Sequence, residues 1–275
     1  MTISTQRHAQ MSTSYPKSNI FMAAKDSPVA PWKRALNYFV VVVAVVAVVG
    51  VSLSMAGIAL NFDFVVHYRA RIWDGFCLTV FISLFSLVGS LIIGIPVALG
   101  QNARFLPVRY LCDFYVKIIR GTPLIAQIYL FYYIIGTAWG VENRVVAGIL
   151  ILSVFAGAYI AEIIRGGYES LPRGPIEAAR ALGLSRVQCA ISVELPQMVS
   201  RILPALTGQF ASIIKDSSLL SVIAVIELTQ TMREISATNY NFFGCFLLLG
   251  VLYLCLTLPI MFISRYFEKK MDYDA

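Results

Sequence analysis

Charged residues are scarce in this 275-residue chain: Asp, Glu, Lys and Arg together make up 13% of it. Soluble domains contain about 25% charged residues, so this scarcity argues against an ordinary soluble fold. Histidine occurs only at His8 and His67, and no two of the five cysteines form a Cys-x-x-Cys pair, which argues against a metal site or a disulfide framework. The dipeptide Gly-Lys is absent, so the usual phosphate-binding loop of ATPases is missing.

Long apolar runs are what the chain has instead. Hydrophobic residues account for 58% of the sequence, and the segments 35–61, 75–103 and 235–264 contain no charged residue. About 20 apolar residues are enough to cross a bilayer as a helix. The sequence therefore predicts an all-α, polytopic membrane protein. Its net charge of +7 fits cytoplasmic loops rich in Lys and Arg better than a nucleic-acid surface, because no separate basic domain is present.

Six membrane spans are predicted in all. We place them at 35–60, 74–101, 112–137, 145–165, 199–226 and 242–264, after a polar N-terminal segment, 1–34, that reads as disordered and cytoplasmic. With the N-terminus inside, fifteen Lys and Arg residues fall on inner segments and only Arg69, Arg71, Arg144 and Arg233 on outer ones. This asymmetry predicts that both termini are cytoplasmic.

The longest inner loop, 166–198, carries a specific pattern. Pro175, Glu177 and the small residues up to Leu182 predict a short helix, which Gly183 would end in a left-handed conformation. The spacing of Glu177-Ala178-Ala179, Gly183, Val193 and Leu195-Pro196 resembles the EAA loop of ATP-binding-cassette importer permeases. Val193 is the one departure, in place of the commoner isoleucine. In that family the loop forms a coupling helix that seats in the ATPase subunit.

The resemblance extends over about residues 74–270. Arg120-Gly-Thr-Pro-Leu-Ile-Ala-Gln127, Gly157-Ala-Tyr-Ile-Ala-Glu-Ile-Ile-Arg-Gly166 and Lys215-Asp-Ser-Ser-Leu219 are similar to segments of the polar amino acid uptake subfamily, which includes histidine and glutamine permeases. The resemblance implies a five-helix type I importer core at 74–270, to which the span at 35–60 is an extra N-terminal transmembrane helix. For ATPase coupling it implicates Glu177, Ala178, Ala179, Gly183, Leu195 and Pro196.

Charges inside the predicted spans are candidates for a substrate pathway, because burying a charge in lipid is costly. Gly121 and Pro123 would break the third span and free backbone polar groups to face a cavity. We hypothesise that the pathway is lined by Arg120, Thr122, Gln127, Glu162, Asp216 and Ser217. The alternative is that Arg120, Glu162, Lys215 and Asp216 pair with one another and only hold the helices together.

The resemblance also implies the partners. These are two ATP-binding subunits at the cytoplasmic loop, a second permease subunit (a homodimer or a heterodimer) and a periplasmic or extracellular amino acid-binding protein, in a bacterial inner membrane. This chain would be no enzyme and would bind no cofactor itself, since ATP and magnesium belong to the ATPase. A self-sufficient carrier or channel, or a membrane anchor that recruits a cytoplasmic protein, are the competing interpretations. The sequence leaves open which amino acid is carried.

Overall fold

The computed structural model describes residues 30–58 and 60–271, and every regular element in those ranges is a helix. The chain divides into two units, residues 1–60 and 61–275. In the first unit the helix α1 runs from Pro31 to Met55 and buries none of its residues within the unit. It begins at Pro31 rather than Ala35, because proline is well accommodated in the first turn of a helix. Most of the segment predicted to be disordered, residues 1–29, lies outside the described ranges.

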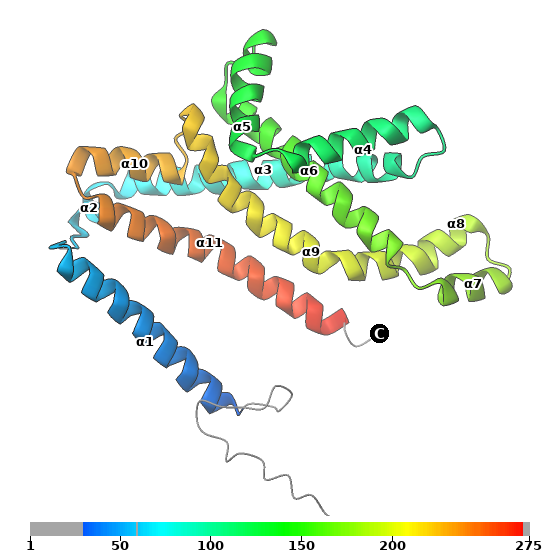
Figure 1. The fold of residues 1–275 in the computed structure, drawn as a ribbon, viewed down its shortest axis with the longest axis horizontal. Helices are drawn as coiled ribbons and strands as arrows, with labels where there is room; N and C mark the ends of the chain where they lie inside the picture. The colour runs from blue at the N-terminus through cyan, green and yellow to red at the C-terminus, as the bar shows by residue number, and fades with distance from the viewer. Residues whose placement is uncertain (1–29, 59, 272–275) are drawn as a thin grey trace, which may run out of the picture. The chain divides into compact units, whose positions relative to one another are not determined.

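The second unit is built from long helices joined by shorter ones (Figure 1). Its elements are α2 (Asp63–His67), α3 (Arg69–Gln101), α4 (Leu106–Gly121), α5 (Leu124–Tyr129), η1 (Leu130–Gly136), α6 (Arg144–Glu169), α7 (Arg173–Ala181), α8 (Arg186–Cys189), η2 (Ala190–Glu194), α9 (Leu195–Asp216), η3 (Ser217–Ile223), α10 (Leu228–Asn239) and α11 (Phe242–Met271).

Four helices in the described part of the chain are long and apolar enough to cross a membrane: α1, α3, α6 and the Phe242–Ser264 part of α11. A fifth span results if α4 and the α5–η1 segment, which are bent by 111° relative to each other, count as one crossing. The helix α9 is not among them. The prediction of an all-helical membrane protein is confirmed, whereas the count of six spans stays a prediction.

The helix α6 lies at the centre of the second unit. In its most apolar stretch 61% of the residues are buried, against 28% in α3 and 11% in α11. Its closest neighbour is α3, and the two backbones approach at Gly94 and Gly157. A Cβ built at Gly94 would lie 2.8 Å from the Gly157 carbonyl oxygen, so this crossing requires a residue without a side chain.

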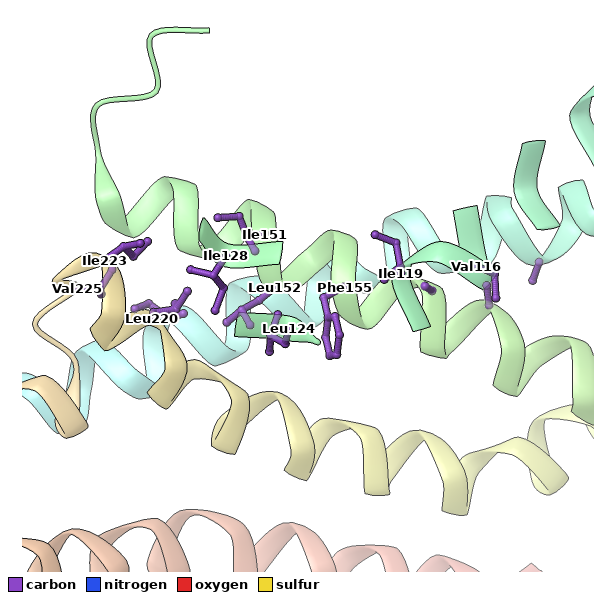
Figure 2. Packing of buried hydrophobic residues seen from close by; sticks show 14 residues of the cluster. Val116, Ile119, Leu124, Ile128, Ile151, Leu152, Phe155, Leu220, Ile223 and Val225 are labelled. Carbon is purple, nitrogen blue, oxygen red and sulfur yellow. The ribbon is translucent and has the colours of Figure 1, made fainter. Parts of the chain in front are cut away.

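One apolar cluster ties the break between α4 and α5 to the centre of the unit. Figure 2 shows Leu124 and Ile128 of α5 beside Leu152 and Phe155 of α6, with Leu220 of η3 in the same cluster. Ile128 and Leu220 are fully buried. The packing therefore fixes the two irregular segments, α5 and η3, against the central helix.

Candidate functional site

The predicted break in the third span is present and is sharper than a kink. The helix α4 ends at Gly121, Thr122 and Pro123 adopt extended backbone, and α5 starts at Leu124 in a new direction. Pro123 has no N–H to donate and disfavours the helical conformation at the preceding residue, and Thr122 is indeed extended, so the helix ends before the proline. The single span predicted at 112–137 is thus two helices, and the first begins earlier, at Leu106.

Gln127, about one turn into α5, forms hydrogen bonds that bridge the break between α4 and α5. Its side-chain amide nitrogen donates to the Ile119 carbonyl oxygen at 2.7 Å, and to the Thr122 carbonyl and hydroxyl oxygens at 3.2 and 2.7 Å. These carbonyl groups belong to the end of α4, where no further helical N–H is available to them. The Gln127 side-chain oxygen is buried and has no hydrogen-bond partner among the described residues. The amide therefore supports the backbone and still offers one unused acceptor.

Arg120 and Glu162 form an ion pair across α4 and α6, with 3.2 Å between guanidinium nitrogen and carboxylate oxygen. Glu162 also accepts two hydrogen bonds from Arg165, and Arg165 in turn reaches Glu169 at 2.6 Å. The Arg120 guanidinium lies over the Tyr159 ring, 5.5 Å from its centre. Arg120 and Glu162 thus pair with each other. Both side chains stay partly accessible, at 38% and 26%, so pairing and contact with a solute remain compatible.

Lys215 and Asp216 lie at a second irregular point, where α9 ends and the tighter helix η3 begins. Lys215 is exposed and Asp216 half-buried, and none of the ion pairs found among the described residues includes either of them. Ser217 is fully buried and donates to the Ile214 carbonyl oxygen at 2.7 Å. The candidate pathway residues therefore lie at two separate breaks, with Glu162 reaching the first of them from α6, and no ion pair among the described residues joins the two breaks.

The predicted loop helix is confirmed as α7, which begins at Arg173, two residues before Pro175. Gly183 has a φ of +84° and ends the helix in the left-handed region, as expected. Ser185 and Gln188 then form a reciprocal capping box that starts α8. We call residues 170–194, between α6 and α9, the projection.

Apolar side chains are exposed on the projection. Leu182, Val187 and Ile191 are 81%, 67% and 60% accessible, whereas Ala179 is buried against the projection itself. Of the other residues implicated in coupling, Glu177, Ala178, Leu195 and Pro196 are exposed. Exposed apolar side chains of this kind are typical of a surface that another protein covers when they gather into one patch.

Sequence reasoning missed a buried carboxylate. Glu227 is fully buried at the start of α10, where it accepts hydrogen bonds from the backbone N–H groups of Thr229 and Gln230 at 2.8 and 2.9 Å. The one signal in the sequence is an acidic residue directly after the apolar run 219–226, at the end of the predicted span 199–226.

Comparison with known proteins identifies the family. The sequence profile of the family described as "binding-protein-dependent transport system inner membrane component" matches residues 90–273. The chain belongs to this family. The match covers the projection and both breaks, so these features belong to the permease core, and α1 lies outside it.

Individual proteins with similar sequences are permeases as well. This permease is 33% identical to the probable glutamine ABC transporter permease protein GlnM of Bacillus subtilis (strain 168), over 72% of this chain and 92% of that protein. It is 35% identical to the glutamine transport system permease protein GlnP of Escherichia coli (strain K12), over 72% of this chain and 91% of that protein.

Solved structures show the same fold. An amino acid ABC transporter crystallised with histidines superposes with a TM-score of 0.72 at 29% identity, over 78% of this permease and 100% of that chain. The MetNI methionine ABC transporter in an inward-facing conformation superposes with a TM-score of 0.60 at 20% identity, over 77% and 99%. The second likeness concerns the fold alone.

Proposed function

We propose that this permease is the transmembrane subunit of an ATP-binding-cassette importer for polar or charged amino acids. The solute crosses by alternating access, driven by ATP hydrolysis on a partner subunit. The observation that carries the proposal is the exposed apolar surface of the projection, with Leu182 81% accessible, in a chain whose relatives are glutamine permeases along more than nine-tenths of their length.

The projection is the surface proposed to bind the ATPase. Its helix α7 ends at a left-handed glycine, and α8 and η2 lead from it without interruption into α9. Movement of the projection would therefore be transmitted to α9, whose other end carries Lys215 and Asp216. In this arrangement both termini are cytoplasmic, two ATP-binding subunits occupy the two projections of a permease dimer, and a binding protein delivers solute from outside.

The two breaks supply the chemistry for a zwitterionic solute. Arg120 and Lys215 are cations for a carboxylate, while Glu162 and Asp216 are anions for an ammonium group. Thr122 is exposed at the first break, whereas Ser217 and the unused Gln127 oxygen, an acceptor suited to an ammonium or amide N–H, are buried and would meet a solute only after the helices move apart. Helix breaks within a membrane are common binding positions for such solutes, because their freed backbone groups add hydrogen-bonding capacity.

Reconstitution tests this function. The permease is purified with the subunits that accompany it and is reconstituted into proteoliposomes that contain ATP or ADP in the lumen. A binding protein and radiolabelled glutamine, histidine, arginine or glutamate are added outside. We expect uptake of at least one of these amino acids with ATP and none with ADP. Uptake by the chain alone under an ion gradient, without nucleotide, would contradict the proposal and favour a self-sufficient carrier.

A further inference from the structure

Arg120 is held in place by contacts that leave most of its hydrogen-bond donors unused. A guanidinium group has five N–H donors, and among the described residues Arg120 makes one ionic contact, between a single nitrogen and the Glu162 carboxylate at 3.2 Å. The side chain is also 38% accessible. The remaining donors can therefore meet a ligand, and the planar fork that they form matches a carboxylate.

The position of this guanidinium group is fixed by α6 and by the end of α4. Its central carbon lies 5.5 Å from the centre of the Tyr159 ring, which packs against the apolar cluster around α6. The preceding residue, Ile119, is 5% exposed and belongs to the same cluster as Phe155, as Figure 2 shows. The Ile119 carbonyl oxygen also accepts the Gln127 amide. A ligand would therefore meet a cation that is already in place, which lowers the entropic cost of binding.

Arg165 holds Glu162 more firmly than Arg120 does. It lies three residues further along α6 and donates to both carboxylate oxygens of Glu162, at 3.1 and 2.5 Å. Two-point contact of this kind is the stronger form of pairing between arginine and a carboxylate. Arg165 is itself held by Glu169 at 2.6 Å. Arg120, with its single longer contact, is thus the weaker competitor for Glu162.

The charges around Glu162 favour an anionic ligand over a cationic one. Two guanidinium groups, from Arg120 and Arg165, contact this one carboxylate. An ammonium group at Glu162 would be the third cation at a single anion, and its repulsion from the other two would oppose binding. A carboxylate beside Arg120 would instead supply the missing negative charge. Glu169 balances Arg165 from the other side, where it is 59% exposed and screened by solvent.

We propose that Arg120 binds the carboxylate of the transported amino acid, and that Arg165 is a positioning residue that keeps Glu162 from occupying Arg120. The proposal rests on the proposed function, since it selects among the charges of the same pathway. Lys215, the other candidate cation, makes no cation–π contact among the described residues and presents a point charge rather than a fork. The ligand class is a free carboxylate, so an amino acid whose carboxylate is converted into an amide should bind poorly.

The first experiment measures the Kd of an amino acid for the purified complex without the binding protein, so that the site on the permease is measured directly. The probe is radiolabelled glutamine, histidine, arginine or glutamate, whichever the reconstituted complex takes up, and the competitor is its α-amide. We expect the unmodified complex to prefer the free carboxylate by about tenfold or more, because the amide loses a charge-assisted pair. Arg120→Gln should raise Kd by about tenfold or more and abolish this preference.

The role of Arg165 is tested by rescue. Arg165→Gln should raise Kd about fivefold, because Glu162 then pairs with Arg120. Adding Glu162→Gln to this variant should restore Kd to within about twofold of the unmodified complex, since no carboxylate then competes for Arg120. Glu169→Gln is the control, because it removes the other carboxylate that Arg165 contacts and leaves the pair with Glu162 intact; Kd should stay within about twofold.

A purely structural role predicts a different pattern. If these charges only hold α4 against α6, Glu162→Gln weakens binding as much as Arg120→Gln, the amino acid and its amide compete equally, and the double variant binds no better than Arg165→Gln; any of these results overturns the proposal. If Arg165→Gln does not fold, Arg165→Lys decides, because lysine keeps the charge but cannot hold both oxygens of Glu162, and an unchanged Kd would refute the positioning role.

Failure of this inference is distinguishable from failure of the proposed function. ATP-dependent uptake by the unmodified complex, together with an unchanged Kd in Arg120→Gln, would overturn the inference and leave the importer intact. No ATP-dependent uptake of any amino acid by the unmodified complex would overturn the proposed function, and the inference with it.

Discussion

Replacing Gly94 by alanine should force α3 and α6 apart. The added Cβ would lie 2.8 Å from the Gly157 carbonyl oxygen and 2.7 Å from a methyl carbon of Ile160. The Ile160 methyl group can move by a change of rotamer, but the Ile160 Cβ, 2.9 Å from the added atom, and the Gly157 carbonyl are fixed to the backbone of α6. Relief of that contact therefore requires the two helices to separate at Gly94 and Gly157.

Overpacking of this kind costs about 1–3 kcal/mol. Alanine is also intrinsically better than glycine in a helix, by about 1 kcal/mol, so the unmodified protein is not the right reference. Gly250→Ala in α11 is the matched control, because a Cβ at Gly250 meets nothing within 4 Å. The difference between the two variants isolates the cost of the contact. For a chain of this size about 1–3 kcal/mol corresponds to a lower melting temperature for Gly94→Ala than for Gly250→Ala, by roughly 2–8 °C.

The assay heats a fluorescent fusion of each variant in detergent and measures, by size-exclusion chromatography, how much folded protein remains at each temperature. Equal melting temperatures for Gly94→Ala and Gly250→Ala would refute the reasoning, since they would mean that α3 and α6 do not cross as closely as described.

Two further predictions concern the breaks and the buried carboxylate. Gln127→Leu should lower the melting temperature and uptake, because the carbonyl groups of Ile119 and Thr122 lose their donor, at a cost of about 1–3 kcal/mol; an unchanged melting temperature would show that the amide does not hold the break. Burial raises the pKa of Glu227, which lies outside the apolar spanning helices, to about 7, above its usual value near 4.5. The folded state then binds the proton more tightly than the unfolded state. The contribution of Glu227 to stability should therefore be greatest below pH 4.5 and fall as the pH rises through 7, by at most about 3 kcal/mol. Glu227→Gln should reduce the difference in melting temperature between pH 5 and pH 8, and an identical difference in both proteins would contradict the raised pKa.

Much of the fold follows from the distribution of charge along the sequence. The charge-free runs predicted α1, α3 and the first part of α11, because a helix is the simplest way to satisfy the backbone in lipid. The loop helix and its left-handed end at Gly183 were also predictable, since proline and glycine act through local sterics. These features depend on residues that are neighbours in the sequence.

The remaining differences arise from contacts between distant residues. Gly121-Thr122-Pro123 predicted a break, but the bend of 111° depends on how α5 packs against α6. The fifth span, predicted to continue to residue 226, ends as an α-helix at Asp216, and η3 follows.

The contact partners of the charged residues could not be predicted from the sequence either. Arg120 was a candidate for pairing, but the choice of Glu162, 42 positions later, is a tertiary contact. The contact between Glu227 and Tyr253 joins residues 26 positions apart on two different helices. No local pattern in the sequence specifies either contact.

Binding of an ATPase subunit to the projection tests the central claim most directly. Leu182 and Trp139 are each 81% accessible, and Trp139 lies outside the projection. The substitutions Leu182→Asn and Trp139→Asn therefore remove equally exposed apolar side chains at small cost to internal packing. Each variant is purified in mild detergent from cells that express the whole system, and the proteins that accompany it are identified by mass spectrometry. The account predicts that an ATP-binding subunit accompanies the unmodified permease and Trp139→Asn, and is lost or strongly reduced with Leu182→Asn. Equal recovery of the subunit with both variants, or none with the folded unmodified permease, would contradict it.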